Sequence, residues 1–126
     1  MYPDNLKYSQ EHEWVKADGN LVTVGITHHA QDALGDIVYV ELPAVGKVFQ
    51  AGQEFGVVES VKSVSALFSP VSGKVVAVNS TLNDQPQTVN AAPYGEGWMI
   101  KLEMSAPAEL NALLSAADYK KIVANK

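Results

Sequence analysis

Short runs of apolar and β-branched residues, separated by turn residues, dominate the chain between residues 14 and 104. The first two runs, EWVKA and LVTVGI, flank Asp18-Gly19, which favours a primed turn and predicts a β-hairpin. Later runs are DIVYVEL, GKVF, EFGVVES, VSALF, GKVVAVN and WMIKLEM. Their lengths and spacing are typical of a small all-β barrel or sandwich.

One helix is predicted between the first hairpin and the later β-runs, and further helices are predicted after the last run. Thr27 is a suitable N-cap for a short helix over HHAQDAL, and Gly35 favours the end of that helix. Near the C-terminus, Ser105, two residues before a proline, predicts the start of a helix. Ser115 begins an S-x-x-D pattern that predicts a capping box and a further helix. We therefore expect a mostly β fold with one helix after the first hairpin and short helices at the C-terminus.

One short pattern occurs twice, at an offset of 27 residues. PAVGKV at 43–48 recurs as PVSGKV at 70–75, and Gly52 and Asn79 stand at matching positions after the two copies. Gly and Asn readily adopt positive φ, so each copy is predicted to form a turn, a short strand and a second turn. The pattern favours a quasi-twofold sandwich of two similar halves; coincidence of common turn residues is the alternative.

Composition narrows the possible functions. At 126 residues the chain is expected to form one domain. Its net charge of −5 argues against nucleic acid as a partner. The apolar runs are too short to span a bilayer, and the first residues lack the features of a signal or transit peptide, so we expect a soluble protein that is cytoplasmic or already processed. Without cysteine, any sulfur chemistry must come from an added group.

A polar segment, ESVKS at 59–63, separates two of the β-runs. The pattern predicts a hairpin that reverses near Val61 and Lys62, with the lysine projecting into solvent. An accessible amine on a rigid turn suits an enzyme that attaches an acyl group. From spacing alone, however, most lysines at turn tips are ordinary solvated residues.

GVVESVKS resembles the lipoylation site of glycine cleavage system H proteins. LKYSQEHEWV, VGITHHAQDALGDIVYVELP, SPVSG and PYGEGWMIKL resemble further segments of that family in the same order, so the likeness covers nearly the whole chain. It implies the barrel-sandwich hybrid of lipoyl and biotinyl carriers, as a single lipoyl-carrier domain over 1–126, with lipoate attached covalently to Lys62. Lipoate-attaching enzymes would recognise the surrounding turn, formed by Glu59, Ser60, Val61 and Ser63.

The resemblance also implies a non-catalytic carrier with three partner enzymes. Glycine decarboxylase (P protein) would load an aminomethyl group, a tetrahydrofolate-dependent aminomethyltransferase (T protein) would take its methylene, and dihydrolipoyl dehydrogenase (L protein) would reoxidise the arm. Tethering raises the effective concentration of the cargo at each partner. The chain would be a monomer in the bacterial cytoplasm, or in the mitochondrial matrix after removal of a transit peptide.

Glu13 matches the family position proposed to contact the cargo amine on the arm. A solvated carboxylate at a strand edge is the alternative. Ala66 departs from relatives that have an acidic residue at this position, so a second anionic contact must come from elsewhere. Considered by themselves, Glu11 and Glu13 share one face of a strand, and we interpret the pair as surface residues.

Other candidate chemistry is weaker. His28 and His29 point about 100° apart on a helix, which argues against a shared metal. No nucleophile elbow or nucleotide-binding glycine motif occurs. Four aromatic residues are expected in the core or in the walls of a cleft: Trp14, Tyr39, Tyr94 and Trp98.

Several alternative functions stay open. Lipoyl domains of 2-oxo acid dehydrogenases usually have an acidic residue before the lysine, and biotin carriers have methionines on both sides, whereas Val61 and Ser63 flank Lys62 here. A lipoyl relay or adaptor that supplies lipoate to other enzymes is a second possibility. An unmodified β-barrel interaction module is a third.

Overall fold

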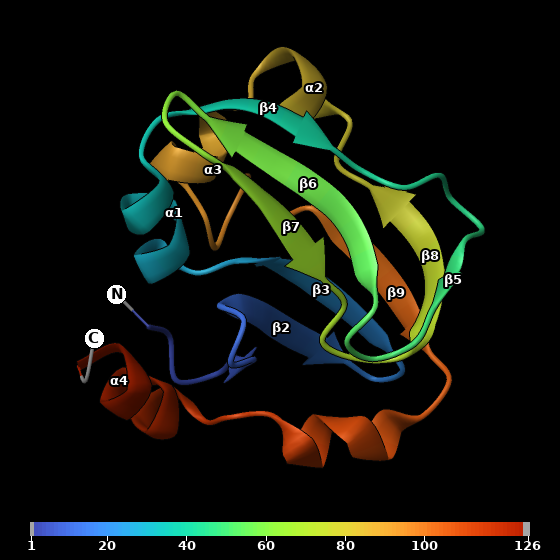
Figure 1. Ribbon diagram of the computed structural model, residues 1–126. Helices are drawn as coiled ribbons and strands as arrows, with labels where there is room; N and C mark the ends of the chain where they lie inside the picture. The colour runs from blue at the N-terminus through green and yellow to red at the C-terminus, as the bar shows by residue number, and fades with distance from the viewer. Residues whose placement is uncertain (1, 125–126) are drawn as a thin grey trace.

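Two antiparallel β-sheets with short helices around them make up the computed structural model, which describes residues 2–124 (Figure 1). The larger sheet has the order β1 (Lys7–Tyr8), β2 (Glu13–Asp18), β3 (Leu21–Ile26), β9 (Ile100–Met104), β8 (Gly73–Val78) and β5 (Val48–Phe49). The smaller sheet has the order β4 (Ile37–Glu41), β6 (Glu54–Ser60) and β7 (Val64–Phe68). The predicted mostly β class is confirmed, with two sheets that do not close into one barrel. The ends of the expected 1–126 domain, residues 1, 125 and 126, lie outside the described residues.

The predicted helices are present, with differences at their ends. Helix α1 (His28–Leu34) is capped by Thr27, whose side chain accepts a hydrogen bond from the Ala30 amide, and it ends at Gly35 with φ 85°. Helix α4 (Ala116–Ala124) begins after Ser115, whose hydroxyl accepts a hydrogen bond from the Asp118 amide at 3.2 Å. Across residues 2–124, no helix is long and apolar enough to cross a membrane.

The segment before α4 differs from the prediction. It is a 3₁₀-helix, η1 (Pro107–Ala112), whose N-cap is Ala106 rather than Ser105. Sequence patterns also missed β1 and two single-turn helices, α2 (Thr81–Asp84) and α3 (Thr88–Ala91), which lie between β8 and β9. Elements this short have no periodicity that could identify them.

The first hairpin is confirmed, but its turn lies one residue later than predicted. Asp18 pairs with Leu21, so Gly19 and Asn20 are the two central residues. Gly19 has φ 63°, which fits a primed turn with glycine at its first central position.

The repeated pattern brings its two copies together. In the first copy Gly46 and Gly52 both have positive φ, as predicted. In the second copy Gly73 lies inside β8 and Asn79 does not have positive φ, so the expected pair of turns is wrong there. Strands β5 and β8 of the two copies pair antiparallel in the larger sheet, so the twofold relation is local. The two sheets themselves differ in size.

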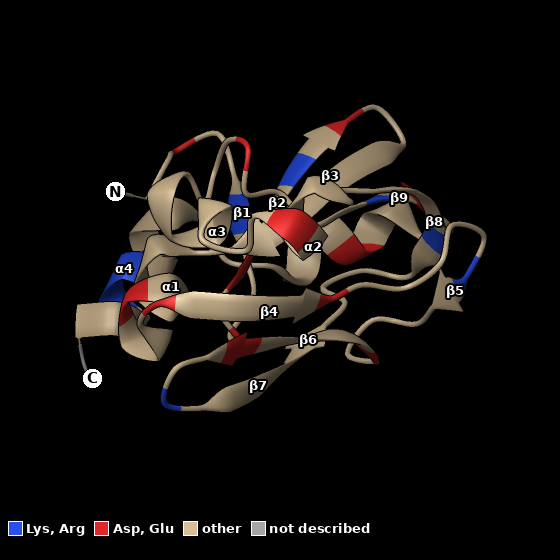
Figure 2. Cartoon of the chain, turned by 90° about the horizontal axis from the view of Figure 1, so that it is seen from above, with Lys and Arg blue, Asp and Glu red and all other residues tan. Residues whose placement is uncertain are grey.

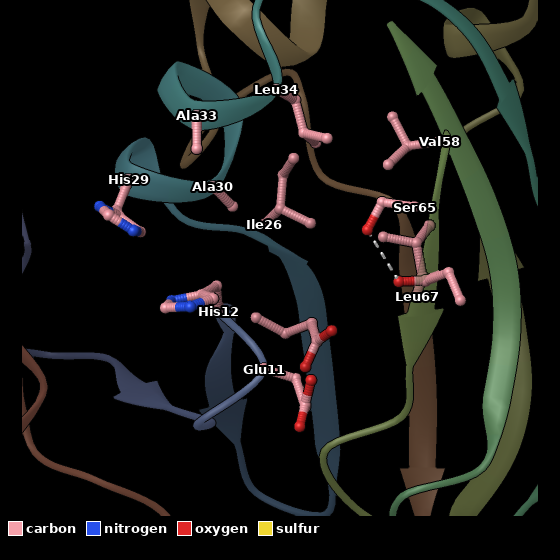
Figure 3. A pocket seen from close by; sticks show the side chains of 12 residues that line it. Glu11, His12, Ile26, His29, Ala30, Ala33, Leu34, Val58, Ser65 and Leu67 are labelled. Carbon is pink, nitrogen blue, oxygen red and sulfur yellow. Dashed lines mark hydrogen bonds between the residues drawn. The ribbon is translucent and has the colours of Figure 1, made fainter. Parts of the chain in front are cut away.

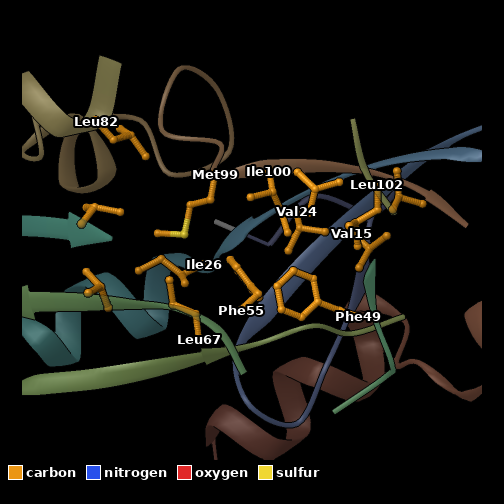
Figure 4. Close-up of a cluster of buried hydrophobic side chains, with 14 of the residues drawn as sticks. Val15, Val24, Ile26, Phe49, Phe55, Leu67, Leu82, Met99, Ile100 and Leu102 are labelled. Carbon is orange, nitrogen blue, oxygen red and sulfur yellow. The ribbon is translucent and has the colours of Figure 1, made fainter. Parts of the chain in front are cut away.

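Most buried apolar side chains lie between the two sheets (Figure 4). A second cluster lies where the C-terminal helix meets β1, with the rings of Tyr8 and Tyr119 stacked at 4.8 Å. Trp14 belongs to this cluster and donates a hydrogen bond from Nε1 to the Pro93 carbonyl at 2.9 Å. Strand β2 therefore contributes to both clusters, with Val15 in the first and Trp14 in the second.

Candidate functional site

Lys62 lies at the tip of the hairpin that joins β6 to β7, at the reversal that its sequence predicts. Glu59 and Val64 form the last strand pair before the turn. The Ser60 amide donates to the Ser63 carbonyl at 2.8 Å, and the Ser60 hydroxyl accepts from the Ser63 amide at 3.1 Å. Ser60 is buried, and its two hydrogen bonds to Ser63 close the turn. The turn therefore holds the exposed Lys62 on a fixed backbone.

The turn rests on the segment between α1 and β4. The Val61 amide donates to the Asp36 carbonyl at 3.1 Å. A Cβ added to Gly35 would lie 3.4 Å from Cε of Lys62, so the lysine side chain passes directly over this backbone. The blue hairpin tip stands at one end of the molecule in Figure 2.

Apolar side chains around the tip face solvent. Val61 is 71% exposed and Val64 is 67% exposed. Tyr39 is 46% exposed, so its expected place in the core or a cleft wall is wrong. Trp14 is buried, and Tyr94 accepts a hydrogen bond from the His28 amide.

A cleft of about 320 Å³ lies beside this hairpin, between α1 on one side and β6 and β7 on the other (Figure 3). Apolar side chains form most of its walls, among them Ile26, Ala30, Leu34, Val58 and Leu67. Ala66 also lines it. Glu11 and Glu13 are the acidic residues that line the cleft, and Glu11 lies at the end beyond His12.

Glu13 is buried, with only 2% of its surface exposed. Its Oε1 accepts a hydrogen bond from the Ser9 hydroxyl at 2.5 Å, and its Oε2 accepts one from the Phe68 amide at 3.2 Å. Burial raises the pKa of Glu13 from its ordinary value to about 7, although these two bonds act in the opposite direction. The nearby charge of Glu11 raises the pKa of Glu13 further. A carboxyl with such a pKa changes its charge near neutral pH.

Glu11 is a surface residue as expected, but the prediction that Glu13 lies on the surface and that the two share one strand face is wrong. Glu13 is the first residue of β2, whereas Glu11 precedes the strand and His12 between them has φ 72°. Glu11 is exposed at the rim and Glu13 is buried within the cleft. The wall opposite Glu13 comes from β7, more than 50 residues later, so a local pattern could not predict the cleft.

A network of hydrogen bonds joins the cleft rim to the C-terminal helix. Nδ1 of His12 lies 2.7 Å from the Tyr119 hydroxyl, which lies 2.8 Å from Oγ1 of Thr27. The His12 and His29 rings are 4.9 Å apart. Among the described residues, no three His, Asp or Glu side chains are grouped to hold a metal ion. Sequence reasoning missed Ser9 and Tyr119, which carry no recognisable motif.

The hairpin and the cleft lie on one side of the molecule. Glu13 contacts Phe68, four residues beyond the first residue of β7, which corresponds to about 13 Å along the strand. The tip therefore presents an amine, and the same hairpin forms one wall of an apolar cleft with a buried carboxylate. Two sheets and a lysine at a hairpin tip are the features that the sequence resemblance implies for a fold of the lipoyl-carrier type.

Comparison with known proteins specifies the carrier. The family model described as Glycine cleavage H-protein matches residues 6–126. The chain belongs to the glycine cleavage H-protein family.

Curated relatives and a solved structure agree with this assignment. The chain is 60% identical over 123 residues to the glycine cleavage system H protein of Carboxydothermus hydrogenoformans, covering 98% of this chain and 95% of the relative. It is 60% identical over 117 residues to that of Bacillus mycoides, covering 93% and 92%. The crystal structure of a glycine cleavage system H protein from Mycobacterium marinum superposes with a TM-score of 0.89 at 41% identity, covering 97% of this chain and 98% of that one.

Proposed function

We propose that the chain is the lipoyl-bearing shuttle of the glycine cleavage system, with lipoate joined as an amide to Nζ of Lys62. The observation that carries this proposal is the placement of Lys62 in a family member. The lysine is exposed at an ordered turn, and its hairpin also forms a wall of the cleft. Glu59, Ser60, Val61 and Ser63 form the surface that a lipoate-attaching enzyme would recognise.

The residues of the cleft fit such a group. When attached, the lipoyl group supplies a redox-active dithiolane, which a chain without cysteine lacks. Leu34, Val58 and Leu67 offer apolar contact and exclude water from the cleft. A protein that only displayed a lysine would need no such space.

Glu13 is suited to hold an amine cargo. A cation beside a buried carboxyl lowers the carboxyl pKa, because the opposite charge favours the ionised form. Glu13 would therefore ionise as the amine enters the cleft and pair with it at low local dielectric. Ser9 and the Phe68 amide fix the carboxylate in place. Ala66 supplies no charge, and Glu11 is the other acidic residue that lines the cleft.

Membership of the family indicates a carrier component rather than an enzyme. We infer that its partners are glycine decarboxylase, the aminomethyltransferase and dihydrolipoyl dehydrogenase, in addition to the lipoate-attaching enzymes. We also infer that it acts as a single-domain monomer. We place it in the bacterial cytoplasm, since the two relatives described above are bacterial proteins.

Glycine–bicarbonate exchange tests the proposal. The chain, purified from a lipoate-competent cell, is mixed with a glycine decarboxylase, and exchange of labelled bicarbonate into glycine is measured. We expect exchange that depends on the chain and is lost in Lys62→Arg. A lipoate relay that is not a shuttle would be modified on Lys62 but would support no exchange, and an unmodified interaction module would show neither property.

A further inference from the structure

The side chain of Asn90, in α3, joins three points of the chain where α1 ends and β4 begins. Its Nδ2 donates to Oε1 of Gln31 and to the Gly35 carbonyl, both at 2.9 Å. Its Oδ1 accepts a hydrogen bond from the Ile37 amide at 2.9 Å. Asn90 thus uses its donors and its acceptor on segment 35–37 and on Gln31 in the middle of α1.

This same segment supports the Lys62 turn. Asp36 accepts the hydrogen bond from the Val61 amide, and the Gly35 backbone lies under the Lys62 side chain. In Figure 1 the tip of the β6–β7 hairpin stands near the end of α1, whose C-cap Gly35 lies under Lys62. Segment 35–37 therefore connects Asn90 to the Lys62 turn, because it is hydrogen-bonded to Asn90 and to the Val61 amide.

Beyond the pairing of β6 with β4, which continues to Ile37 and Ser60, the tip has little other support from the body of the protein. Strand β7 is an edge strand of the smaller sheet, so it pairs only with β6. The pairing of β4 with β6 is irregular between Ile37 and Tyr39, next to the turn. The hydrogen bonds of Ser60 with Ser63 lie within the turn and fix its shape, not its direction. From outside the hairpin, segment 35–37 contacts the turn through the Asp36 carbonyl and the Gly35 backbone.

We propose that Asn90 is a positioning residue for Lys62: it fixes segment 35–37, which sets the orientation in which the turn is presented to the lipoate-attaching enzyme. The inference rests on the proposed function of Lys62 as the attachment site. An enzyme that recognises a shaped turn acts fastest when the turn is already in that shape, because no binding energy is lost in ordering it.

Asn79 provides a matched control for Asn90. It is a largely buried asparagine whose Nδ2 donates to the carbonyls of Glu96 and Trp98 at 2.7 and 2.8 Å. None of these groups belongs to segment 35–37 or to the hairpin. Asn79→Ala therefore removes a similar set of side-chain hydrogen bonds elsewhere in the fold.

The test compares Asn90→Ala with Asn79→Ala as purified, unmodified proteins. Two quantities are measured: kcat/KM for lipoyl attachment, followed by intact mass, and hydrogen exchange of the Val61 amide. For Asn90→Ala we expect kcat/KM on the order of tenfold below that of Asn79→Ala. We also expect faster exchange at Val61 in Asn90→Ala alone, with the Ser63 amide unchanged. A general loss of stability would affect both variants alike.

Equal kcat/KM values for the two variants, or unchanged exchange at Val61, would overturn the inference. If Asn90→Ala does not fold, Asn90→Asp takes its place, since it keeps the acceptor for Ile37 and places a carboxylate against the Gly35 carbonyl. If the wild-type chain accepts no lipoyl group, the proposed function fails, whereas exchange at Val61 still decides whether Asn90 orders the tip.

Discussion

The Lys62 turn and the Glu13 cleft are built in opposite ways. Four consecutive residues, 60–63, form the turn, and their own hydrogen bonds give it its shape. The cleft combines the segment before β2 with α1 and with β7, and its carboxylate is buried. An attachment site must be recognisable from outside, whereas a site for a reactive cargo must exclude water. The difference separates what the chain displays from what it protects.

The largest expected effect is the loss of lipoyl attachment at the Lys62 turn. Lys62→Arg keeps the positive charge but removes the nucleophilic amine, so lipoyl attachment should be lost completely. Lys47→Arg is the control, since Lys47 is also exposed and lies just before a short strand. Incubation with a lipoate-attaching enzyme and intact-mass measurement should show modification of the control alone. Modification of Lys62→Arg would place the site on another lysine.

The next effect concerns the cleft, where Glu13 makes the free energy of unfolding depend on pH. The pKa of Glu13 in the folded chain, about 7, exceeds its ordinary value of 4.5, so folding favours the protonated carboxyl. Stability should therefore fall as pH rises from about 4.5 through about 7. Glu13→Gln cannot titrate, so its stability relative to the wild type should rise by roughly 2 to 3 kcal/mol between pH 4.5 and pH 8.

Urea unfolding of wild type and Glu13→Gln across this pH range measures the difference. Glu11→Gln is the control, because Glu11 is exposed and should show a much smaller pH-dependent difference. A constant gap between wild type and Glu13→Gln at all pH values would mean that the Glu13 pKa is not raised.

A smaller effect is expected on the cargo. Without a negative charge at residue 13, the amine loses its buried partner, and the loaded protein should decay on the order of tenfold faster in Glu13→Gln. The decay is followed by release of formaldehyde or ammonia from the loaded chain in the absence of other enzymes. An unchanged lifetime would remove Glu13 from the account of cargo protection.

The smallest effect concerns the internal bonds of the turn. Ser60→Ala removes the hydroxyl that accepts from the Ser63 amide, at an expected cost of about 1 kcal/mol. Hydrogen exchange should become faster at Ser63 than elsewhere in the fold, and the midpoint of global unfolding should fall by only a few degrees. Slower lipoyl attachment should accompany the change; a fully protected Ser63 amide would show that Ser60 does not hold the turn.

Sequence alone predicted the hairpin of Lys62 well because all of its determinants are local. Strands β6 and β7 cover the same residues as the predicted runs EFGVVES and VSALF. Alternation, turn residues and a polar tip act over a few neighbouring positions, so these local patterns are sufficient to predict the hairpin. The role of Lys62 needed more, and the resemblance to a known family supplied it.

The cleft shows where such reasoning ends. Glu13 is buried because Phe68 and Ser9 close around it, and neither contact follows from alternation along β2. The clamp of Asn90 on segment 35–37 joins residues 53 to 59 positions apart in the chain. Burial and long-range hydrogen bonds depend on how elements pack, and local patterns do not determine that packing.

The central claim is that Lys62 carries the lipoyl group. The most direct test is the intact mass of the wild-type chain purified from a lipoate-competent cell, followed by mapping of the modified peptide. We expect one lipoyl increment, on the peptide that contains Lys62. An unmodified mass, or an increment on another lysine, would contradict it.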